Sequence, residues 1–276
     1  MKGIILAGGL GSRLHPMTRV TNKHLLPVYD RPMIYYPLQQ LVHAGIREIL
    51  VVTGGDSAGD FLRLLRNGRE FGLSHLDYTY QEGEGGIAEA LGLAEHFADG
   101  EPVAVVLGDN LFEQPIAPSI QRYLKVGSGA RILLKEVEDP ERFGVPAFDG
   151  DHQIVRIHEK PSDPPSSYAV TGCYMFDARV FDIIRTLEPS GRGELEITDV
   201  NNRFIEWEEM EWDAVDGWWT DAGTIPSLYR ATKLVAECED NAVLRSRGGS
   251  EALSHRRPSY SPSSVSQPFP SGDGAA

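Results

Sequence analysis

The first half of the chain alternates short apolar runs with segments of helical periodicity. Uninterrupted, β-branched apolar runs predict strands at 3–7, 48–53, 76–80 and 103–107. Apolar residues at helical spacing predict helices at 33–44, 58–66 and 87–97. Strands that are apolar throughout are typical of a parallel sheet with helices on both faces. The pattern therefore predicts an α/β, Rossmann-like fold, in which ligands bind at the carboxyl ends of the strands.

The second half is less regular and is joined by Gly, Pro and Asp turns. Strands are predicted at 132–137, 144–148, 154–158 and 169–176, and helices at 178–187 and 196–207. We interpret these segments as a smaller β-rich subregion that closes over a mixed, mainly parallel sheet. The acidic segment 206–211 is most simply a solvated face.

The composition changes near residue 241, after which Ser, Gly, Pro and Arg dominate. Such a segment cannot bury enough apolar surface to offset the loss of chain entropy on folding. We therefore expect one folded domain over 1–240 and a disordered tail over 241–276.

The charge balance narrows the class of partner. The chain has 26 Lys and Arg against 40 Asp and Glu, a net charge of −14. A nucleic-acid-binding protein, or one that binds an anionic membrane, needs net basic faces, so neither partner is expected. Residues 1–40 nevertheless hold five basic residues and one acidic residue. This local excess suggests a site for a small anion.

Other signals are weak. The two cysteines, Cys173 and Cys238, lie at no metal-ligand spacing, and the eight histidines form no paired ligand motif. No segment approaches the ~20 apolar residues of a membrane span, and the apolar run at the N-terminus is shorter than that of a signal peptide. A cytoplasmic location is the expectation.

The segment 8–14, GGLGSRL, follows the first predicted strand. Glycines in such a loop let backbone N–H groups approach a phosphate, although a tight strand-to-helix turn is the simpler alternative. A dinucleotide-binding fingerprint would need glycine at Leu14, and a P-loop would need a final Gly-Lys-Ser/Thr, so neither is present. A phosphate cradle with Arg13 and a second cation, Lys23, remains. Two such cations suit a triphosphate better than a redox dinucleotide.

Asp109 lies just beyond the strand predicted at 103–107. A carboxylate at the carboxyl end of a strand is well placed to hold Mg²⁺, which prefers oxygen ligands and commonly bridges a protein carboxylate and substrate phosphates. A turn or helix-capping aspartate is the alternative.

Several ordered motifs resemble the sugar-1-phosphate nucleotidyltransferases, most of all a short form of the glucose-1-phosphate thymidylyltransferases within that family. The resemblance begins with GGLGSRL, with Lys23 followed by Leu26 and Pro27, and with RPMIYYP at 31–37. It continues through LGDN at 107–110, PERFGV at 140–145, HEKP at 158–161, YAVTG at 168–172, RGELEITD at 192–199 and WTDAG at 219–223. It covers about residues 1–237.

The resemblance implies an activity and a cofactor. A phosphate oxygen of α-D-glucose 1-phosphate attacks the α-phosphorus of dTTP, giving dTDP-glucose and pyrophosphate, with Mg²⁺ as cofactor. Arg13 and Lys23 are implied as the catalytic cations, and Asp109 and Asp221 as the metal ligands.

The resemblance also assigns binding residues. Those implied for the nucleotide are Gly8, Gly9, Gly11, Ser12, Arg13, Lys23, Gln81 and Gly86. Those implied for the sugar phosphate are Asn110, Gly144, Glu159, Lys160, Val170 and Gly172. The nucleotide-binding part would then span about 1–130 and the sugar-binding part about 131–225.

Other functions stay open at this point. The loop at 81–86, QEGEGG, is more glycine-rich and acidic than is usual in the family, which leaves UTP as an alternative to dTTP. A catalytically silent nucleotide-sugar-binding subunit is a second alternative, although a pure binder has no need of Arg13, Lys23, Asp109 and Asp221 together. The oligomeric state is left open, with a homo-oligomer as one option.

Overall fold

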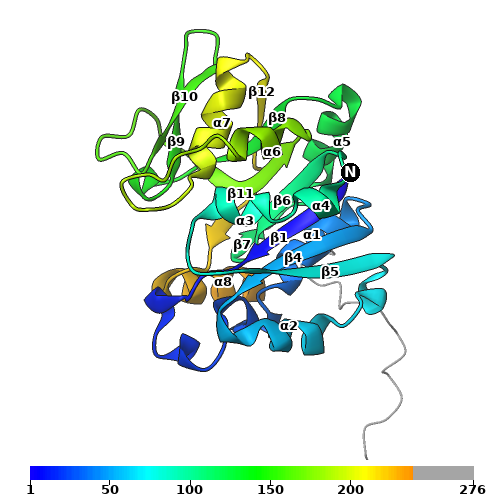
Figure 1. The fold of residues 1–276 in the computed structure, drawn as a ribbon. Coiled ribbons are helices and arrows are strands. Elements are labelled where there is room, and N and C mark those ends of the chain that lie inside the picture. The colour runs from blue at the N-terminus through cyan, green and yellow to red at the C-terminus, as the bar shows by residue number, and fades with distance from the viewer. Residues whose placement is uncertain (239–276) are drawn as a thin grey trace, which may run out of the picture.

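A seven-stranded sheet forms the centre of the computed structural model, which describes residues 1–238 (Figure 1). Its strands lie in the order β12 (Met210–Ala214), β8 (Ala130–Glu136), β11 (Tyr168–Phe176), β6 (Val103–Leu107), β1 (Lys2–Ala7), β4 (Glu48–Gly54) and β5 (His75–Gln81). From β6 to β5 the strands run parallel, β12 is parallel to β8, and β11 is antiparallel to both neighbours. The sheet is mixed and mainly parallel, which confirms the predicted fold class.

Helices cover both faces of this sheet, because successive side chains of each strand point to opposite faces. Ile4 and Leu6 of β1 pack with α3 (Ile87–Gly92), α4 (Glu95–Ala98), α6 (Arg179–Ile184) and α7 (Ile197–Glu206). Ile5 and Ala7 pack with α1 (Tyr35–His43), α2 (Ala58–Leu65) and α5 (Ala117–Val126) on the other face. A third apolar cluster joins α8 (Ile225–Glu237) to the turn region near Val28.

Three short antiparallel pairs lie outside the central sheet. β9 (Gly144–Phe148) and β10 (Ile154–Glu159) form a hairpin that contacts α7. β7 (Asn110–Phe112) pairs with β13 (Trp219–Asp221), and β2 (Pro27–Val28) pairs with β3 (Arg31–Pro32). In Figure 1 the hairpin stands at the α7 end of the molecule, and α8 lies near the N-terminal loops.

The predicted β-rich subregion is only partly separate from the sheet. The segments predicted at 132–137 and 169–176 are β8 and β11 of the central sheet, and of the strands predicted beyond residue 131 only the β9–β10 hairpin lies outside it. The predicted helix over 87–97 is two helices, α3 and α4. The helices α5 and α8 and the short strands β7 and β13 were not predicted.

The expectation of a solvated face over 206–211 agrees with the exposure of Glu206, Glu208 and Glu211, but the edge strand β12, which begins at Met210 beside β8, was not predicted. Arg131 of β8 is buried and lies 2.9 Å from Asp213 and 3.8 Å from Glu211. This cation neutralises the acidic side chains of the edge strand, so an acidic segment can join the sheet.

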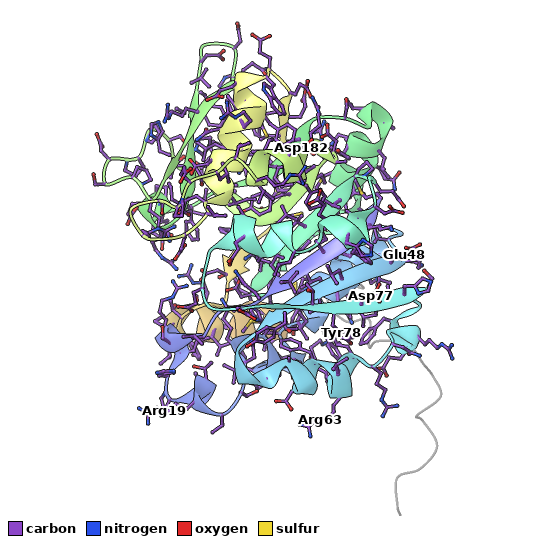
Figure 2. The ribbon with its side chains drawn as sticks, viewed as in Figure 1. Arg19, Glu48, Arg63, Asp77, Tyr78 and Asp182 are labelled. Atoms are coloured by element: carbon purple, nitrogen blue, oxygen red, sulfur yellow. The ribbon has the colours of Figure 1, made fainter. Side chains whose placement is uncertain are left out.

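The predicted tail at 241–276 lies outside the described residues. Within residues 1–238, no helix combines the length and the apolar character that crossing a membrane requires. Charged side chains such as Arg19, Arg63 and Asp182 are exposed on the surface (Figure 2).

Candidate active site

The glycine loop lies directly after β1. Gly9 and Gly11 have φ angles of 87° and 64°, a region that favours glycine. The Thr18 hydroxyl donates to the Gly11 carbonyl oxygen at 2.7 Å, and buried Leu14 anchors the far end of the loop. Ser12 and Arg13 are exposed between these anchors. The loop is held by its neighbours while its polar groups stay accessible.

Lys23 reaches from the turn after the glycine loop to Asp109, at the end of β6. Its Nζ donates to Asp109 Oδ2 at 2.6 Å, and the two side chains are only 15% and 13% exposed. Burial raises the pKa of Asp109, but the Lys23 charge, together with the hydrogen bonds from Lys23 and Asn110, outweighs burial and holds the pKa well below its usual range. Asp109 is therefore a buried carboxylate that stays ionised.

Asp221 lies beside Asp109. The pairing of β13 with β7 sets Asp221 opposite Asn110, and the Ala222 N–H donates to the Asp109 carbonyl oxygen at 2.8 Å. A Cβ on Gly223 would lie 3.3 Å from both Asp109 Oδ2 and Asp221 Oδ2, and 3.6 Å from Arg13 Nη2. The glycine thus leaves a small space bordered by two carboxylates and a guanidinium group.

Asn110 joins this space to β11. Its Nδ2 donates to Asp109 Oδ1 at 3.1 Å, and its Oδ1 accepts from the Gly172 N–H at 2.9 Å and from Trp219 Nε1 at 2.7 Å. A Cβ on Gly172 would lie 2.6 Å from the Asn110 amide, so only glycine fits there. Val170 lies on the same strand and is buried. The amide of Asn110 is therefore held in one orientation.

Gln81 ends β5, and its side chain reaches the glycine loop. Its Oε1 lies 2.7 Å from the position that a Cβ on Gly8 would take. Its Nε2 donates to Glu89 Oε2 at 2.6 Å and to the Gly86 carbonyl oxygen at 3.2 Å. Gly8 therefore makes room for Gln81, in addition to any role in binding phosphate.

Two hydrogen-bond contacts tie the loop after Gln81 to its surroundings. The Leu10 N–H of the glycine loop donates to Glu84 Oε1 at 2.9 Å. The Leu195 N–H donates to the Gly85 carbonyl oxygen at 2.8 Å. A Cβ on Gly86, where φ is 98°, would lie 2.5 Å from the Leu195 carbonyl oxygen. The loop thus lies between the glycine loop and the segment that precedes α7.

The β9–β10 hairpin carries a second polar group. Glu159 lies opposite Gly144 in the hairpin, and its Oε2 accepts from the Thr198 hydroxyl at 2.6 Å. Its Oε1 lies 3.3 Å from Arg192 Nη2 and 3.7 Å from Lys160 Nζ. Lys160 is exposed. The carboxylate of Glu159 is therefore oriented from two sides.

Arg142 connects the hairpin to the paired aspartates. Its guanidinium group lies 2.6 Å from Asp139 and 3.3 Å from Asp221 Oδ1, and the adjacent Phe143 ring packs edge-on against Trp219 at 5.2 Å. The structure therefore brings the residues predicted for the metal together with Arg13, Lys23, Asn110 and Gly172, whereas Gly144, Glu159 and Lys160 lie on the separate hairpin that follows Arg142.

His24 is buried next to the ion pair. Its Nδ1 lies 2.8 Å from Asn22 Oδ1, and a Cβ on Gly108 would lie 2.6 Å from its ring. Burial, together with the nearby Lys23 charge, lowers the pKa of His24 to about 3. The imidazole is neutral at physiological pH and supports the turn that carries Lys23.

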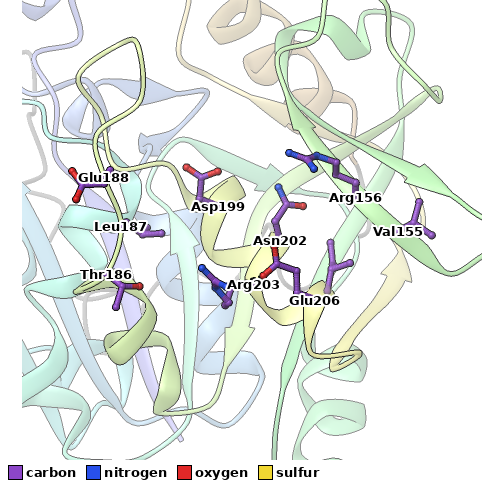
Figure 3. Close-up of a pocket in the computed structure, with 10 residues that line it drawn as sticks. Val155, Arg156, Thr186, Leu187, Glu188, Asp199, Asn202, Arg203 and Glu206 are labelled. Atoms are coloured by element: carbon purple, nitrogen blue, oxygen red, sulfur yellow. Dashed lines mark hydrogen bonds and ion pairs between the residues drawn. The ribbon is translucent and has the colours of Figure 1, made fainter.

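A separate hollow of about 460 Å³ lies between β10, α7 and the segment after α6 (Figure 3). None of the predicted site residues lines it. Asn202 in its wall bonds to the backbone of Ile157 through both polar atoms of its amide, so it links α7 to β10.

Sequence reasoning missed four residues of the site: Arg142, Trp219, Glu84 and Glu89. Arg142 lies within a motif that we quoted but had no implied role. Trp219 lies next to the predicted ligand Asp221, with no signal for its bond to Asn110. The acidic loop at 81–86 was noticed for its composition, but its contact through Glu84 depends on the tertiary fold.

The donor set around Gly223 fits a hard divalent cation. Mg²⁺ is commonly held by one or two carboxylates together with substrate phosphates. Asp109 and Asp221 each offer one carboxylate oxygen, 3.3 Å from the Cβ position of Gly223. Over the described part of the chain, no three His, Cys, Asp or Glu side chains form a complete metal site. Further ligands would come from substrate and water.

Comparison with known proteins points to one family. The model of the family described as nucleotidyl transferase matches residues 2–237. A relative from Neisseria meningitidis, named glucose-1-phosphate thymidylyltransferase, is 44% identical over 238 residues, which cover 85% of this chain and 82% of the relative.

Solved structures agree with this result. A Bacillus anthracis protein assigned as a glucose-1-phosphate thymidylyltransferase, in complex with sucrose, has a TM-score of 0.83 and 48% identity, covering 88% of this chain and 98% of that one. A UDP-glucose pyrophosphorylase in complex with UDP-glucose has a TM-score of 0.74 and 25% identity, covering 85% and 98%.

The buried imidazole of His24 predicts a pH-dependent stability. Its folded pKa of about 3 lies below the unfolded value of 6.5. The unfolded chain therefore takes up a proton first, and stability is full above pH 6.5 and falls as the pH drops toward 3. Between pH 7 and pH 5, this group should cost about 2 kcal/mol of unfolding free energy.

Urea unfolding at the two pH values measures this effect. Between pH 7 and pH 5, the unfolding free energy of His24→Gln should fall by about 2 kcal/mol less than that of the wild type. His96→Gln, at an exposed histidine, should lose as much unfolding free energy as the wild type. An equal loss in wild type and His24→Gln would contradict the burial of a neutral imidazole.

Proposed function

The chain belongs to the nucleotidyl transferase family, and on that premise we propose that it transfers the thymidylyl group of dTTP to α-D-glucose 1-phosphate, giving dTDP-glucose and pyrophosphate. The relatives named glucose-1-phosphate thymidylyltransferase, from Neisseria and Actinoplanes among others, support this substrate pair at 44% identity. The observation that carries the proposal in this chain is the meeting of Asp109, Asp221 and Arg13 around Gly223, with Lys23 on Asp109.

The proposed reaction is an in-line displacement. A phosphate oxygen of glucose 1-phosphate forms a bond to the α-phosphorus of dTTP while the bond to the leaving pyrophosphate breaks. The attacking phosphate is already ionised, so the reaction needs alignment and charge neutralisation more than a base. A site with two cations and two carboxylates around one space meets this need.

In this reaction the cations act on the phosphates. Arg13 neutralises the triphosphate and the charge that develops on the leaving group, and Lys23 holds the phosphates at the reacting centre. Asp109 and Asp221 would hold Mg²⁺, which polarises the α-phosphate when bound.

The nucleotide would lie over the ends of β1 and β5. The backbone N–H groups of Gly8, Gly9 and Gly11, with the Ser12 hydroxyl, bind phosphate in this proposal. Gln81 and Gly86 bind the base. The position of Gln81 Oε1 over Gly8 supports one continuous wall for base and phosphates.

The sugar phosphate would lie toward the hairpin. In this proposal Lys160 binds its phosphate, and the residues that bind the glucose hydroxyls are Asn110, Gly144, Glu159, Val170 and Gly172. The fixed orientations of Asn110 and Glu159 support this role, because a bound sugar then meets polar groups that are already ordered.

A panel of triphosphates tests the function. With glucose 1-phosphate and Mg²⁺, pyrophosphate release is measured for dTTP, UTP, CTP and GTP in turn. We expect the highest kcat/KM with dTTP. A clear preference for UTP would assign a uridylyltransferase instead, and nucleotide binding without pyrophosphate release from any of the four would identify a silent binding subunit.

Asp109→Asn tests the metal assignment. The amide keeps the shape of the side chain but lacks the charge, so kcat should fall by roughly 10²–10³-fold, while far-UV circular dichroism shows a folded protein. Asp77→Asn, on the exposed side of β5 (Figure 2), is the matched control and should keep wild-type turnover. Near-normal turnover in Asp109→Asn would remove Asp109 from the metal site.

A further inference from the structure

The Gln81 amide has no free N–H group in this structure. An amide NH₂ group has two hydrogens, and Gln81 Nε2 has two acceptors: Glu89 Oε2 at 2.6 Å and the Gly86 carbonyl oxygen at 3.2 Å. Gln81 Oε1 accepts no hydrogen bond from any residue among 1–238 and lies over Gly8. The group that Gln81 offers to a ligand is therefore an acceptor.

The chemistry of the neighbours determines this orientation. A carboxylate and a backbone carbonyl are both acceptors, so an amide rotated by 180° would set its oxygen against two other oxygens. Gln81 is also buried, so the rotated amide could not regain its hydrogen bonds from bulk water. Glu89 accounts for the shorter of the two contacts.

The local fold makes room for Glu89 at this position. Its carboxylate lies 2.1–2.5 Å from where a Cβ on Gly85 would be, so any side chain at Gly85 would displace it. The Ala88 N–H donates to the Leu195 carbonyl oxygen at 3.1 Å and the Leu195 N–H donates to the Gly85 carbonyl oxygen at 2.8 Å, which ties the chain just before Glu89 to the segment before α7. Glu89 is half-buried in α3.

We propose that Glu89 is a positioning residue that sets base specificity, by holding Gln81 so that only its amide oxygen faces the base. An acceptor recognises the N3–H donor of thymine or uracil, and is repelled by cytosine N3, which is itself an acceptor. Glu89 thus selects the imide pyrimidines against cytosine. This inference rests on the proposed function, in which Gln81 contacts the base.

The orientation of the Gln81 amide selects against cytosine, but it does not distinguish dTTP from UTP. Thymine and uracil present the same N3–H and the same two carbonyl groups, so a Gln81 that acts through one acceptor treats them alike. UTP and CTP therefore form the sharpest test pair, since they share the ribose and the triphosphate and differ only in the edge of the base.

The test measures binding rather than turnover. Isothermal titration calorimetry with Mg²⁺ and no sugar phosphate gives Kd for UTP and for CTP, in the wild type and in Glu89→Gln. The wild type should bind UTP at least about tenfold more tightly than CTP, the factor expected for one well-placed hydrogen bond. A Gln at position 89 can donate as well as accept, which lets the Gln81 amide rotate, so the ratio should fall by roughly tenfold.

Two further variants sharpen the result. Glu89→Met keeps the side-chain length and removes the acceptor, and it should also lower the ratio. Glu82→Gln makes the same charge change in the loop that precedes α3, at an exposed side chain that has no hydrogen bond within residues 1–238, and it should keep the wild-type ratio. A merely structural role for Glu89 would weaken both nucleotides together and leave the ratio unchanged.

The outcomes of these titrations distinguish the proposed role of Glu89 from the proposed nucleotidyl transfer. An unchanged ratio in both Glu89 variants, or a wild type that binds UTP and CTP equally, overturns the role of Glu89 while leaving nucleotidyl transfer intact. A wild type that binds none of dTTP, UTP and CTP overturns the proposed function, and the inference with it.

Discussion

Two carboxylates, Asp109 and Asp221, border one small space at the end of the central sheet. The fold has to place cationic side chains beside them to offset the repulsion between the two negative charges. Lys23 pairs with Asp109, Arg142 pairs with Asp221, and Arg13 borders the same space. Removing one partner of the mostly buried Lys23–Asp109 pair costs up to about 3–5 kcal/mol, because it leaves an uncompensated charge, whereas the more exposed Arg142–Asp221 pair contributes less. The position of Lys23 is thus constrained by the stability of the fold. The same cations carry the charge that an anionic triphosphate requires.

The site is assembled from segments that are far apart in the sequence, and a few contacts hold them together. Glu84 bonds to the glycine loop at Leu10, and Leu195 bonds to the loop that follows Gln81. Asn110 links the end of β6 to β11 and to Trp219. The proposed base, phosphate and sugar contacts therefore share one rigid framework, and a change in one loop is expected to alter the geometry of the next.

The sequence predicted the parallel strands of the sheet well, because uninterrupted apolar runs such as those of β1 and β6 are typical of buried strands, but it missed the helices α5 and α8. It predicted the edge strand β12 poorly, because the acidic residues of that strand are neutralised by Arg131, which is distant in the chain. The candidate site followed from motifs, and the structure brings Asp109 and Asp221 together as those motifs implied. The role of Glu89 could not be predicted, since it depends on where the Gln81 amide points after folding.

The central claim is that Asp109 and Asp221 jointly hold the divalent cation of the bound triphosphate. Crystals grown with Mn²⁺ and a non-hydrolysable dTTP analogue test it most directly, because Mn²⁺ accepts the oxygen ligands that Mg²⁺ prefers and is located by its anomalous scattering. The account predicts an anomalous peak in direct contact with one carboxylate oxygen of each aspartate and with the phosphates. A peak that contacts neither aspartate, or only one of them, would contradict it.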